Sequence, residues 1–127
     1  MEVAYELTKI DKENDGIKFT LTMKSNGYLA VGLGSGMNNV DMVMCNKDAT
    51  TNKPKCTDLW STTTSTPKTD VTQDITLIEA ESFVNDKDRK FVFTRKLDTG
   101  DTNEDTILVS GKTYNFYKAW GESDSFV

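Results

Sequence analysis

Three of the chain's five methionines lie within eight positions of the sequence, close to a glycine-rich turn. They are Met37, Met42 and Met44, in the stretch GYLAVGLGSGMNNVDMVMC at residues 27–45. A thioether is apolar and flexible, so methionine most often fills gaps in a core, and we expect this of Met42 and Met44. Met37 differs because it lies among glycines and asparagines, where it has little to pack against. Its soft sulfur is therefore a candidate axial ligand of haem iron.

Histidine, the side chain that most nucleophilic enzymes use as a general base, is missing from this sequence. The chain has no histidine, which excludes a Ser–His–Asp triad, a Cys–His dyad and histidine general-base chemistry among these residues. Carboxylate pairs remain chemically possible, but no pair among the 20 acidic residues stands out by its spacing. We therefore expect that the chain is not an enzyme and has no catalytic residues.

Acidic residues gather in the stretch DTGDTNED, directly after a strand-like segment that contains Arg95. Hard cations bind such clusters of oxygen atoms. Arg95, however, lies on the apolar face of its segment, and a buried guanidinium needs a carboxylate partner. We expect a structural ion pair here, with a bound metal ion as the alternative. The candidate partners of Arg95 are Asp98, Asp101, Glu104, Asp105, Asp70 and Asp74.

The two cysteines, Cys45 and Cys56, flank ten residues of polar loop, NKDATTNKPK. An even number of cysteines on the two sides of a turn favours a disulfide, and two cysteines without a histidine make a poor zinc site. In the chain-entropy account, closing so short a loop contributes about 2–3 kcal/mol to stability. Two separate buried thiols are the alternative.

Length and charge limit the classes of protein and partner. A chain of 127 residues most often forms one domain and buries enough surface to fold without staples. The formal net charge is -5, which makes nucleic acid a poor partner. No apolar run approaches the roughly 18 residues that span a bilayer. We expect a single domain over residues 1–127 that was excised from a longer protein.

The hydrophobic pattern has a period of two along most of the chain. In GIKFTLTMK, residues 16–24, apolar and polar side chains alternate, as in a strand with one buried face. A similar segment at 3–9 precedes it, and DKENDG joins the two as a hairpin loop. Further strands are expected at 56–61, 74–84 and 90–97.

Three strand-like segments lack a polar face. They are residues 27–33, 40–45 and 113–120, with Asp41 as the polar exception. Such strands are covered on both sides. Short strands with frequent turn signals predict an all-β fold, an antiparallel, immunoglobulin-like β-sandwich of about nine to eleven strands. A second buried surface, outside the core, must then meet a ligand, a covering loop or a partner.

Four stretches carry a family resemblance, and they follow one another along nearly the whole chain. The first, NGYLAVGLGSGMNNVDMVMC, combines a strand, a glycine turn and a GM…D element. The second, TDLWSTTTSTPKTDVTQDITLI, has an Asp–aromatic–Ser, Pro, Asp, Gln–Asp pattern. The others are FVFTRKLDTGDTNED, a Phe-x-Arg-x-Leu-x-Thr-x-Asp run, and YNFYKAWG, a closing aromatic–Ala–Gly strand. Together they resemble the DOMON domain, an extracellular β-sandwich family that includes haem-binding cytochrome domains.

This resemblance implies a haem site. In the haem-binding branch, one axial ligand is a methionine after the glycine turn, which corresponds to Met37. The other is a histidine a little beyond the Ala-x-Gly strand, and the sequence reaches Val127 without one, so the second axial ligand is absent from this chain. Asp41 matches an acidic residue that in some members helps to bind a metal ion or holds the loop. Arg95 matches a strand arginine that is usually structural.

The resemblance also bears on location and partners. The family is typically extracellular or exported, which favours oxidation of Cys45 and Cys56. We therefore expect an extracellular or lumenal domain of a secreted or membrane-anchored protein, without a membrane span of its own. Its expected partner is a small-molecule ligand or a neighbouring domain or subunit.

Two functions stay open at this point. The first is a b-type haem module for electron transfer, in which Met37 is an axial ligand and aromatic side chains line an apolar slot. The expected lining residues are Tyr28, Trp60, Phe116 and Trp120. The second is a non-haem module that binds a sugar or another small ligand, or that packs against a neighbouring domain or subunit.

Overall fold

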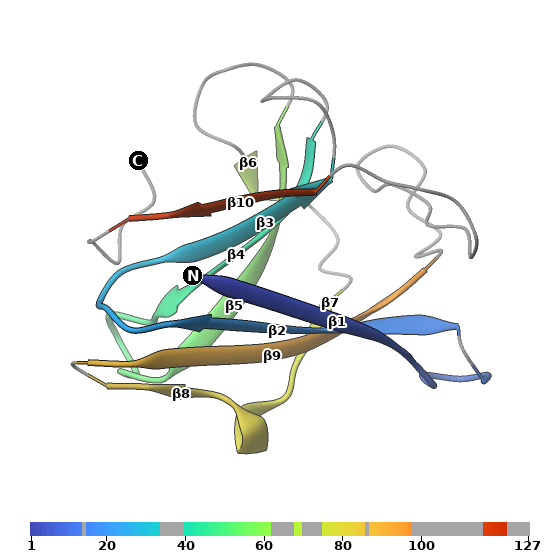
Figure 1. Ribbon diagram of the computed structural model, residues 1–127, viewed down its shortest axis with the longest axis horizontal. Helices are drawn as coiled ribbons and strands as arrows, with labels where there is room; N and C mark the ends of the chain where they lie inside the picture. The colour runs from blue at the N-terminus through green and yellow to red at the C-terminus, as the bar shows by residue number, and fades with distance from the viewer. Residues whose placement is uncertain are drawn as a thin grey trace.

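The computed structural model describes the following residues: 1–13, 15–33, 40–61, 68–69, 75–85, 87–97 and 116–121. In this part of the chain, two antiparallel sheets pack face to face around one core (Figure 1). The antiparallel β-sandwich predicted from the sequence is confirmed. The described residues include no helix long and apolar enough to cross a bilayer.

Sheet A, the lower sheet in Figure 1, has the strand order β1-β2-β9-β7, with β8 also paired to β9. Its strands are β1 (Glu2–Thr8), β2 (Gly16–Met23), β7 (Ile75–Leu77), β8 (Phe83–Val84) and β9 (Arg89–Lys96). Sheet B, the upper sheet, has the order β10-β3-β4-β5-β6. Its strands are β3 (Leu29–Leu33), β4 (Val40–Lys47), β5 (Pro54–Ser61), β6 (Lys68–Thr69) and β10 (Phe116–Trp120).

The core lies between the sheets and follows the period-two pattern of the strands. In β2 every second side chain is buried, namely Ile17, Phe19, Leu21 and Met23. Phe93 of β9 lies opposite Phe19, with ring centroids 5.2 Å apart. Burying one such ring contributes about 1.5–3 kcal/mol. The strands predicted at residues 16–24 and 90–97 are therefore confirmed as β2 and β9.

One carboxylate holds the loop between β1 and β2. Asp15 accepts hydrogen bonds from three backbone N–H groups, those of Ile10 at 2.7 Å, Asp11 at 3.0 Å and Lys12 at 3.0 Å. These bonds, and most of all the one from Ile10, hold the pKa of Asp15 below its ordinary value of 3.8. The stabilisation is therefore present above that value and is lost as the pH falls through the lower pKa of the folded state. The predicted hairpin is confirmed.

The segment predicted as one strand over residues 74–84 is divided in the structure. β7 and β8 both pair with β9, but the 3-10 turn η1 (Glu79–Glu81) separates them. The Glu-Ala-Glu sequence of η1 has low strand propensity. The Ser82 hydroxyl holds the turn, since it donates to the carbonyl of Ile78 at 2.8 Å and accepts from the N–H of Val92 at 2.9 Å. The prediction of a continuous strand is wrong for this reason.

A covalent bridge links β4 and β5. Cys45 and Cys56 lie directly opposite each other in the register and form a disulfide, with Cα atoms 4.0 Å apart. The disulfide predicted from the sequence is confirmed. Cys45 is buried among the core residues, so the bridge fastens the β4–β5 hairpin at the inner face of sheet B.

An ion pair crosses the core from one sheet to the other. Arg95 of β9 donates from Nη2 to Oδ2 of Asp41 in β4 at 2.8 Å, and both side chains are 4% exposed. Every second side chain of a strand points to the same face. Asp41 therefore lies on the inner face of β4, together with the core residues Val43 and Cys45. Either charge would be costly to bury alone, so the pair fixes how β4 lies against β9.

The buried, carboxylate-paired state predicted for Arg95 is confirmed, but its partner in the described residues is Asp41. For this aspartate the family resemblance implied a role in binding a metal ion or in holding the loop, and the pair with Arg95 was not predicted. The two residues are 54 positions apart and belong to different sheets, so no local pattern relates them. The partners expected from the sequence, at positions 70, 74 and 98–105, lie outside the described residues.

We expect Asp41→Ala to lower the free energy of unfolding by about 3–5 kcal/mol, because it leaves the Arg95 guanidinium buried without this carboxylate. The matched control is Glu81→Gln, which breaks the more exposed pair with Lys18 at 3.1 Å and costs about 1 kcal/mol or less. Urea denaturation with the disulfide intact measures both. Equal losses in the two variants would contradict a structural role for the buried pair.

Candidate ligand-binding site

The outer face of sheet B carries a second apolar cluster. Along β3, Leu29 and Val31 belong to the core, so Ala30 between them points to the other side of the sheet. The cluster to which Ala30 belongs is here called the outer cluster. Its buried members are Ala30, Met42 and Leu59, and its partly buried members are Tyr28, Met44 and Ala119. This is the second buried surface that the two-sided strands predicted.

The strand register arranges these side chains in rows across the sheet. Ala119 of β10 lies opposite Ala30 of β3, which in turn lies opposite Met44 of β4. In the next row, Gly32 of β3 lies opposite Met42 of β4. Small residues on β10 and β3 thus adjoin long side chains on β4. A face of this kind suits the flat side of a planar ligand.

Two sequence motifs meet at the edge of the outer cluster. The N–H of Gly121, in the aromatic–Ala–Gly motif, donates to the carbonyl of Tyr28 at 3.2 Å. A Cβ atom on residue 121 would lie 2.9 Å from Cζ of the Tyr28 ring. Glycine at this position therefore lets the ring lie directly against the backbone.

Met37, the predicted axial ligand, lies in residues 34–39, outside the described residues. The strands on either side are described, and Leu33 at the end of β3 pairs with Asp41 near the start of β4. This stretch therefore leaves and re-enters sheet B at two neighbouring strands that both contribute to the outer cluster. The ion pair between Asp41 and Arg95 holds the point of re-entry.

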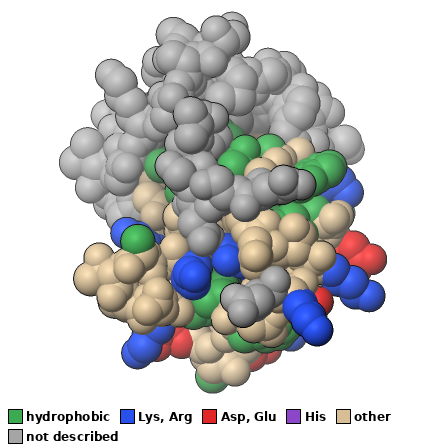
Figure 2. All heavy atoms as spheres, turned by 90° about the vertical axis from the view of Figure 1, so that its left-hand side faces the viewer, with side chains coloured by type: hydrophobic (Ala, Val, Ile, Leu, Met, Phe, Trp, Pro, Cys, Tyr) green, Lys and Arg blue, Asp and Glu red, His purple; other side chains and the backbone are tan. Residues whose placement is uncertain are grey.

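The aromatic residues predicted to line a haem slot have different surroundings. Tyr28 packs on the outer cluster. Trp120 is 55% exposed and pairs with the core residue Leu29. It therefore lies on the face of β10 that points away from the outer cluster. The backbones of Trp60 and Phe116 lie in β5 and β10, and their side chains are outside the described part. Figure 2 shows one end of the molecule, where a group of hydrophobic side chains lies near the middle and basic side chains lie around and below it.

The described residues contain no group of three or more acidic, cysteine or histidine side chains that could hold a metal ion. Asp41, a predicted metal ligand, accepts the hydrogen bond from Arg95 with Oδ2. The guanidinium thus supplies the positive charge that a cation would otherwise bring to this oxygen. The geometry therefore supports a positioning role for Asp41.

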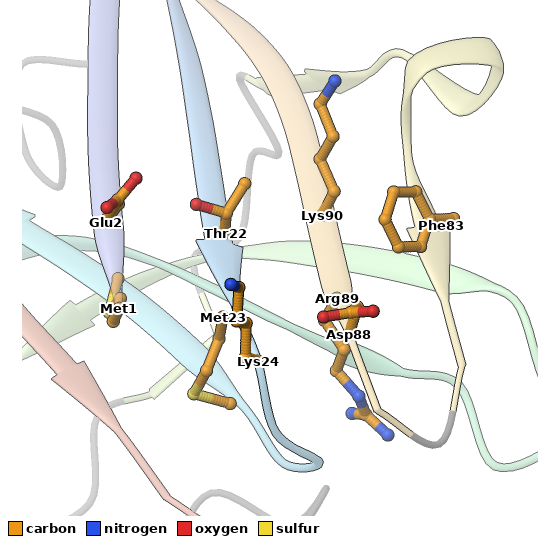
Figure 3. A pocket seen from close by; sticks show the side chains of 9 residues that line it. All are labelled: Met1, Glu2, Thr22, Met23, Lys24, Phe83, Asp88, Arg89 and Lys90. Carbon is orange, nitrogen blue, oxygen red and sulfur yellow. The ribbon is translucent and has the colours of Figure 1, made fainter.

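A hollow of about 490 Å³ opens on sheet A. Four of its side chains form a row across β1, β2, β9 and β8, which Figure 3 shows side by side: Glu2, Thr22, Lys90 and Phe83. The other lining residues are Met1, Met23, Lys24, Asp88 and Arg89. The sequence indicated none of them as a site, because they come together only through the register of four strands.

Arg89, one of the lining residues of this hollow, is held in place by burial and by a hydrogen bond. Its side chain is buried, and Nη1 donates to the carbonyl of Gly27 at 2.7 Å. Gly27 has a φ of 115°, which favours glycine. This hydrogen bond links the turn between β2 and β3 to the start of β9. It therefore helps to hold in place the two strands that carry Thr22 and Lys90.

Comparison with known proteins supports the family resemblance. The DOMON domain profile matches residues 4–121, and no curated protein sequence matches the chain. The cytochrome b domain of pyranose dehydrogenase from Coprinopsis cinerea is similar with a TM-score of 0.67 and 15% identity, over 96% of this chain and 62% of that one. The cytochrome domain of Myriococcum thermophilum cellobiose dehydrogenase is similar with a TM-score of 0.54 and 13% identity, over 96% of this chain and 73% of that one.

At these identities the likeness shows a shared fold. The chain spans less than two thirds of the length of the Coprinopsis cinerea structure.

We expect Gly121→Ala to lower the free energy of unfolding by about 1–3 kcal/mol, because the added methyl group pushes the Tyr28 ring off the outer cluster. In a Tyr28→Leu background the same substitution costs less, since the smaller side chain leaves room. Urea denaturation of the four proteins of this double-mutant cycle measures the coupling. Additive costs would show that the contact does not position Tyr28.

Proposed function

The chain belongs to the DOMON family, and from this premise we propose that it is a ligand-binding module that holds b-type haem and transfers electrons. Two solved structures that share its fold are cytochrome domains of dehydrogenases. In this proposal the chain itself is not an enzyme. It serves as an electron-carrying unit beside a partner that performs the chemistry.

The observation that carries the proposal is the outer cluster. Its members are apolar or aromatic, and Tyr28, Met44 and Ala119 are only partly buried, so they leave apolar surface outside the core that a ligand could cover. A porphyrin is planar and largely apolar, so it gains free energy by leaving water against such a face. The small side chains of Ala30 and Ala119 allow a flat group to approach the sheet closely.

We assign an axial position to Met37. When bound, haem iron supplies reversible one-electron oxidation and reduction. A thioether ligand raises the reduction potential relative to nitrogen ligands. The stretch between β3 and β4 would bring the sulfur to the outer cluster, and the pair of Asp41 and Arg95 would keep its end in place. The chain has no histidine, and Met37 is the one residue to which this proposal assigns contact with the iron.

The same proposal covers location and partners. The disulfide between Cys45 and Cys56 suits an oxidising compartment, so we place the domain outside the cell or in a lumen. Its redox partner would be a neighbouring domain or subunit, with which a small module of this size exchanges electrons by contact.

We expect the Soret band of added haem to sharpen and to shift to a longer wavelength than that of free haem in the presence of the purified protein, and Met37→Ala to weaken haem binding at least about tenfold, a loss of about 1.4 kcal/mol. The variant should also lose the long-wavelength charge-transfer band of sulfur-ligated ferric haem. Met23→Leu is the matched control, because it removes a thioether from the core between the sheets. An unchanged spectrum in Met37→Ala would exclude this ligand, and a Soret band that stays the same as that of free haem when the native chain is added would exclude haem binding.

A second candidate function is carbohydrate binding at the hollow on sheet A. Phe83 is 44% exposed, and an exposed aromatic ring can stack on the apolar face of a sugar. Glu2, Asp88 and Lys90 also line the hollow, and such groups can form hydrogen bonds with sugar hydroxyls. The hollow is on sheet A and the outer cluster is on sheet B, so the two candidates can be tested separately.

Glycan-array screening of the native chain tests this second function. We expect Phe83→Ala to weaken binding of any retained glycan about tenfold, because the stacking surface is removed. Tyr5→Leu serves as the control, since Tyr5 is an exposed aromatic residue that does not line the hollow. Equal losses in the two variants, or no retained glycan, would exclude the hollow as a carbohydrate site.

A further inference from the structure

Large hydrophobic side chains are exposed along one edge of the sandwich. In β1, Tyr5 is 63% and Leu7 is 48% exposed, and Ile10 just beyond the strand is also exposed. Tyr5 and Leu7 pair with the core residues Phe19 and Ile17, so they lie on the inner face of sheet A. An inner face normally lies under the other sheet. Here it extends past the cover that sheet B provides.

The strand that carries these residues ends sheet A in the described part of the chain (Figure 1). Its seven residues pair with β2 without interruption, from Glu2 opposite Thr22 to Thr8 opposite Gly16. Natural edge strands are commonly protected by a proline, a bulge or charged side chains, most often lysine. β1 has no proline or lysine and pairs with β2 without a bulge, and its two charged residues, Glu2 and Glu6, lie on the outer face, so it is a regular edge with an apolar inner face.

We propose that β1 is the interface between two copies of this chain, in which the two β1 strands pair in antiparallel fashion about a two-fold axis. Such pairing joins the two copies of sheet A into one continuous sheet. It keeps both inner faces on the same side, so the exposed residues of one copy cover those of the other. The proposal is independent of haem or carbohydrate binding.

The register of the paired β1 strands is defined by the residue that lies at the two-fold axis. The positions of the two glutamates in β1 disfavour an axis at Ala4 and an axis at Glu6. A two-fold axis at Ala4 would place Glu2 of one copy opposite Glu6 of the other. An axis at Glu6 would place Glu6 of one copy opposite Glu6 of the other. Like charges directly opposite each other destabilise a strand pair, so both registers are disfavoured.

An axis at Tyr5 removes this conflict. It places Val3 opposite Leu7 and the two Tyr5 rings opposite each other, so the apolar side chains meet on the inner face. Glu6 then lies opposite Ala4, and Glu2 lies opposite the neutral Thr8. The sequence of β1 is thus self-complementary in the register that pairs the strand over its full length, which is the reason for choosing a second copy as the occupant.

The edge of sheet B lies nearby and extends the same surface. Lys118 of β10 donates from Nζ to the carbonyl of Met1 at 3.3 Å, which places β10 beside the beginning of β1. Trp120, two residues further along, is on the same face of β10 and is 55% exposed. In the paired state this tryptophan would border the partner copy.

Sedimentation velocity over a wide range of concentrations tests the pairing. We expect a monomer–dimer equilibrium for the native chain and, for Tyr5→Lys, a dissociation constant raised at least about tenfold, because two ammonium groups then meet at the axis. Thr20→Lys is the control, since it adds the same charge on the outer face of β2. Circular dichroism confirms that both variants are folded.

A cross-linking experiment tests the register. We expect Tyr5→Cys to form a disulfide-linked dimer on mild oxidation, because residues directly opposite in an antiparallel pair have Cα atoms about 4.5–5.5 Å apart. Thr8→Cys should remain unlinked, since its copies would be far apart along the strands. A native chain that stays monomeric while its β1 amides resist hydrogen exchange would show that another segment covers the edge. That result, a Tyr5→Lys dimer of native affinity, or equal linking of both cysteine variants would overturn the proposal.

Discussion

Arg95 and Asp41 bring a guanidinium and a carboxylate together between the sheets, where both are almost completely removed from water. Apolar side chains in a core tolerate small sliding movements, but a buried ion pair is stable only while its two partners stay in contact. The pair therefore sets the position of β4 on β9. Because β4 also carries part of the outer cluster and follows the stretch that contains Met37, the same contact fixes the strand that comes directly after this proposed ligand.

The two sheets use their outer faces differently, and the sequence of each strand explains this. In β2, polar residues alternate with core residues, so the outer face of sheet A is solvated in the usual way. In β3 and β4, both faces are apolar, so sheet B has one face for the core and one for the outer cluster. An apolar surface outside the core must be covered by a ligand, by another segment of the chain or by a partner. The asymmetry of the sandwich is therefore the physical basis of the proposed function.

The sequence was sufficient to predict which side chains are buried wherever this depends on the pattern within a single strand. The alternation in β2 and β9 predicted their buried faces, and the spacing of Cys45 and Cys56 predicted the disulfide that the register brings together. The break between β7 and β8 was missed because it depends on the Ser82 hydroxyl. This hydroxyl accepts the hydrogen bond of the Val92 N–H and donates to the carbonyl of Ile78.

Contacts between sheets were less accessible to sequence reasoning. The partner of Arg95 lies on the opposite sheet, and which residues of two stacked sheets meet is decided by how the sheets are placed on each other. The hollow has the same origin, since its row of four residues requires the combined register of four strands. The last described residue, Gly121, lies against the Tyr28 ring, so the polypeptide passes this position beside the outer cluster. Any downstream segment or module thus begins its path next to whatever is bound there, and even a short tether would reach it.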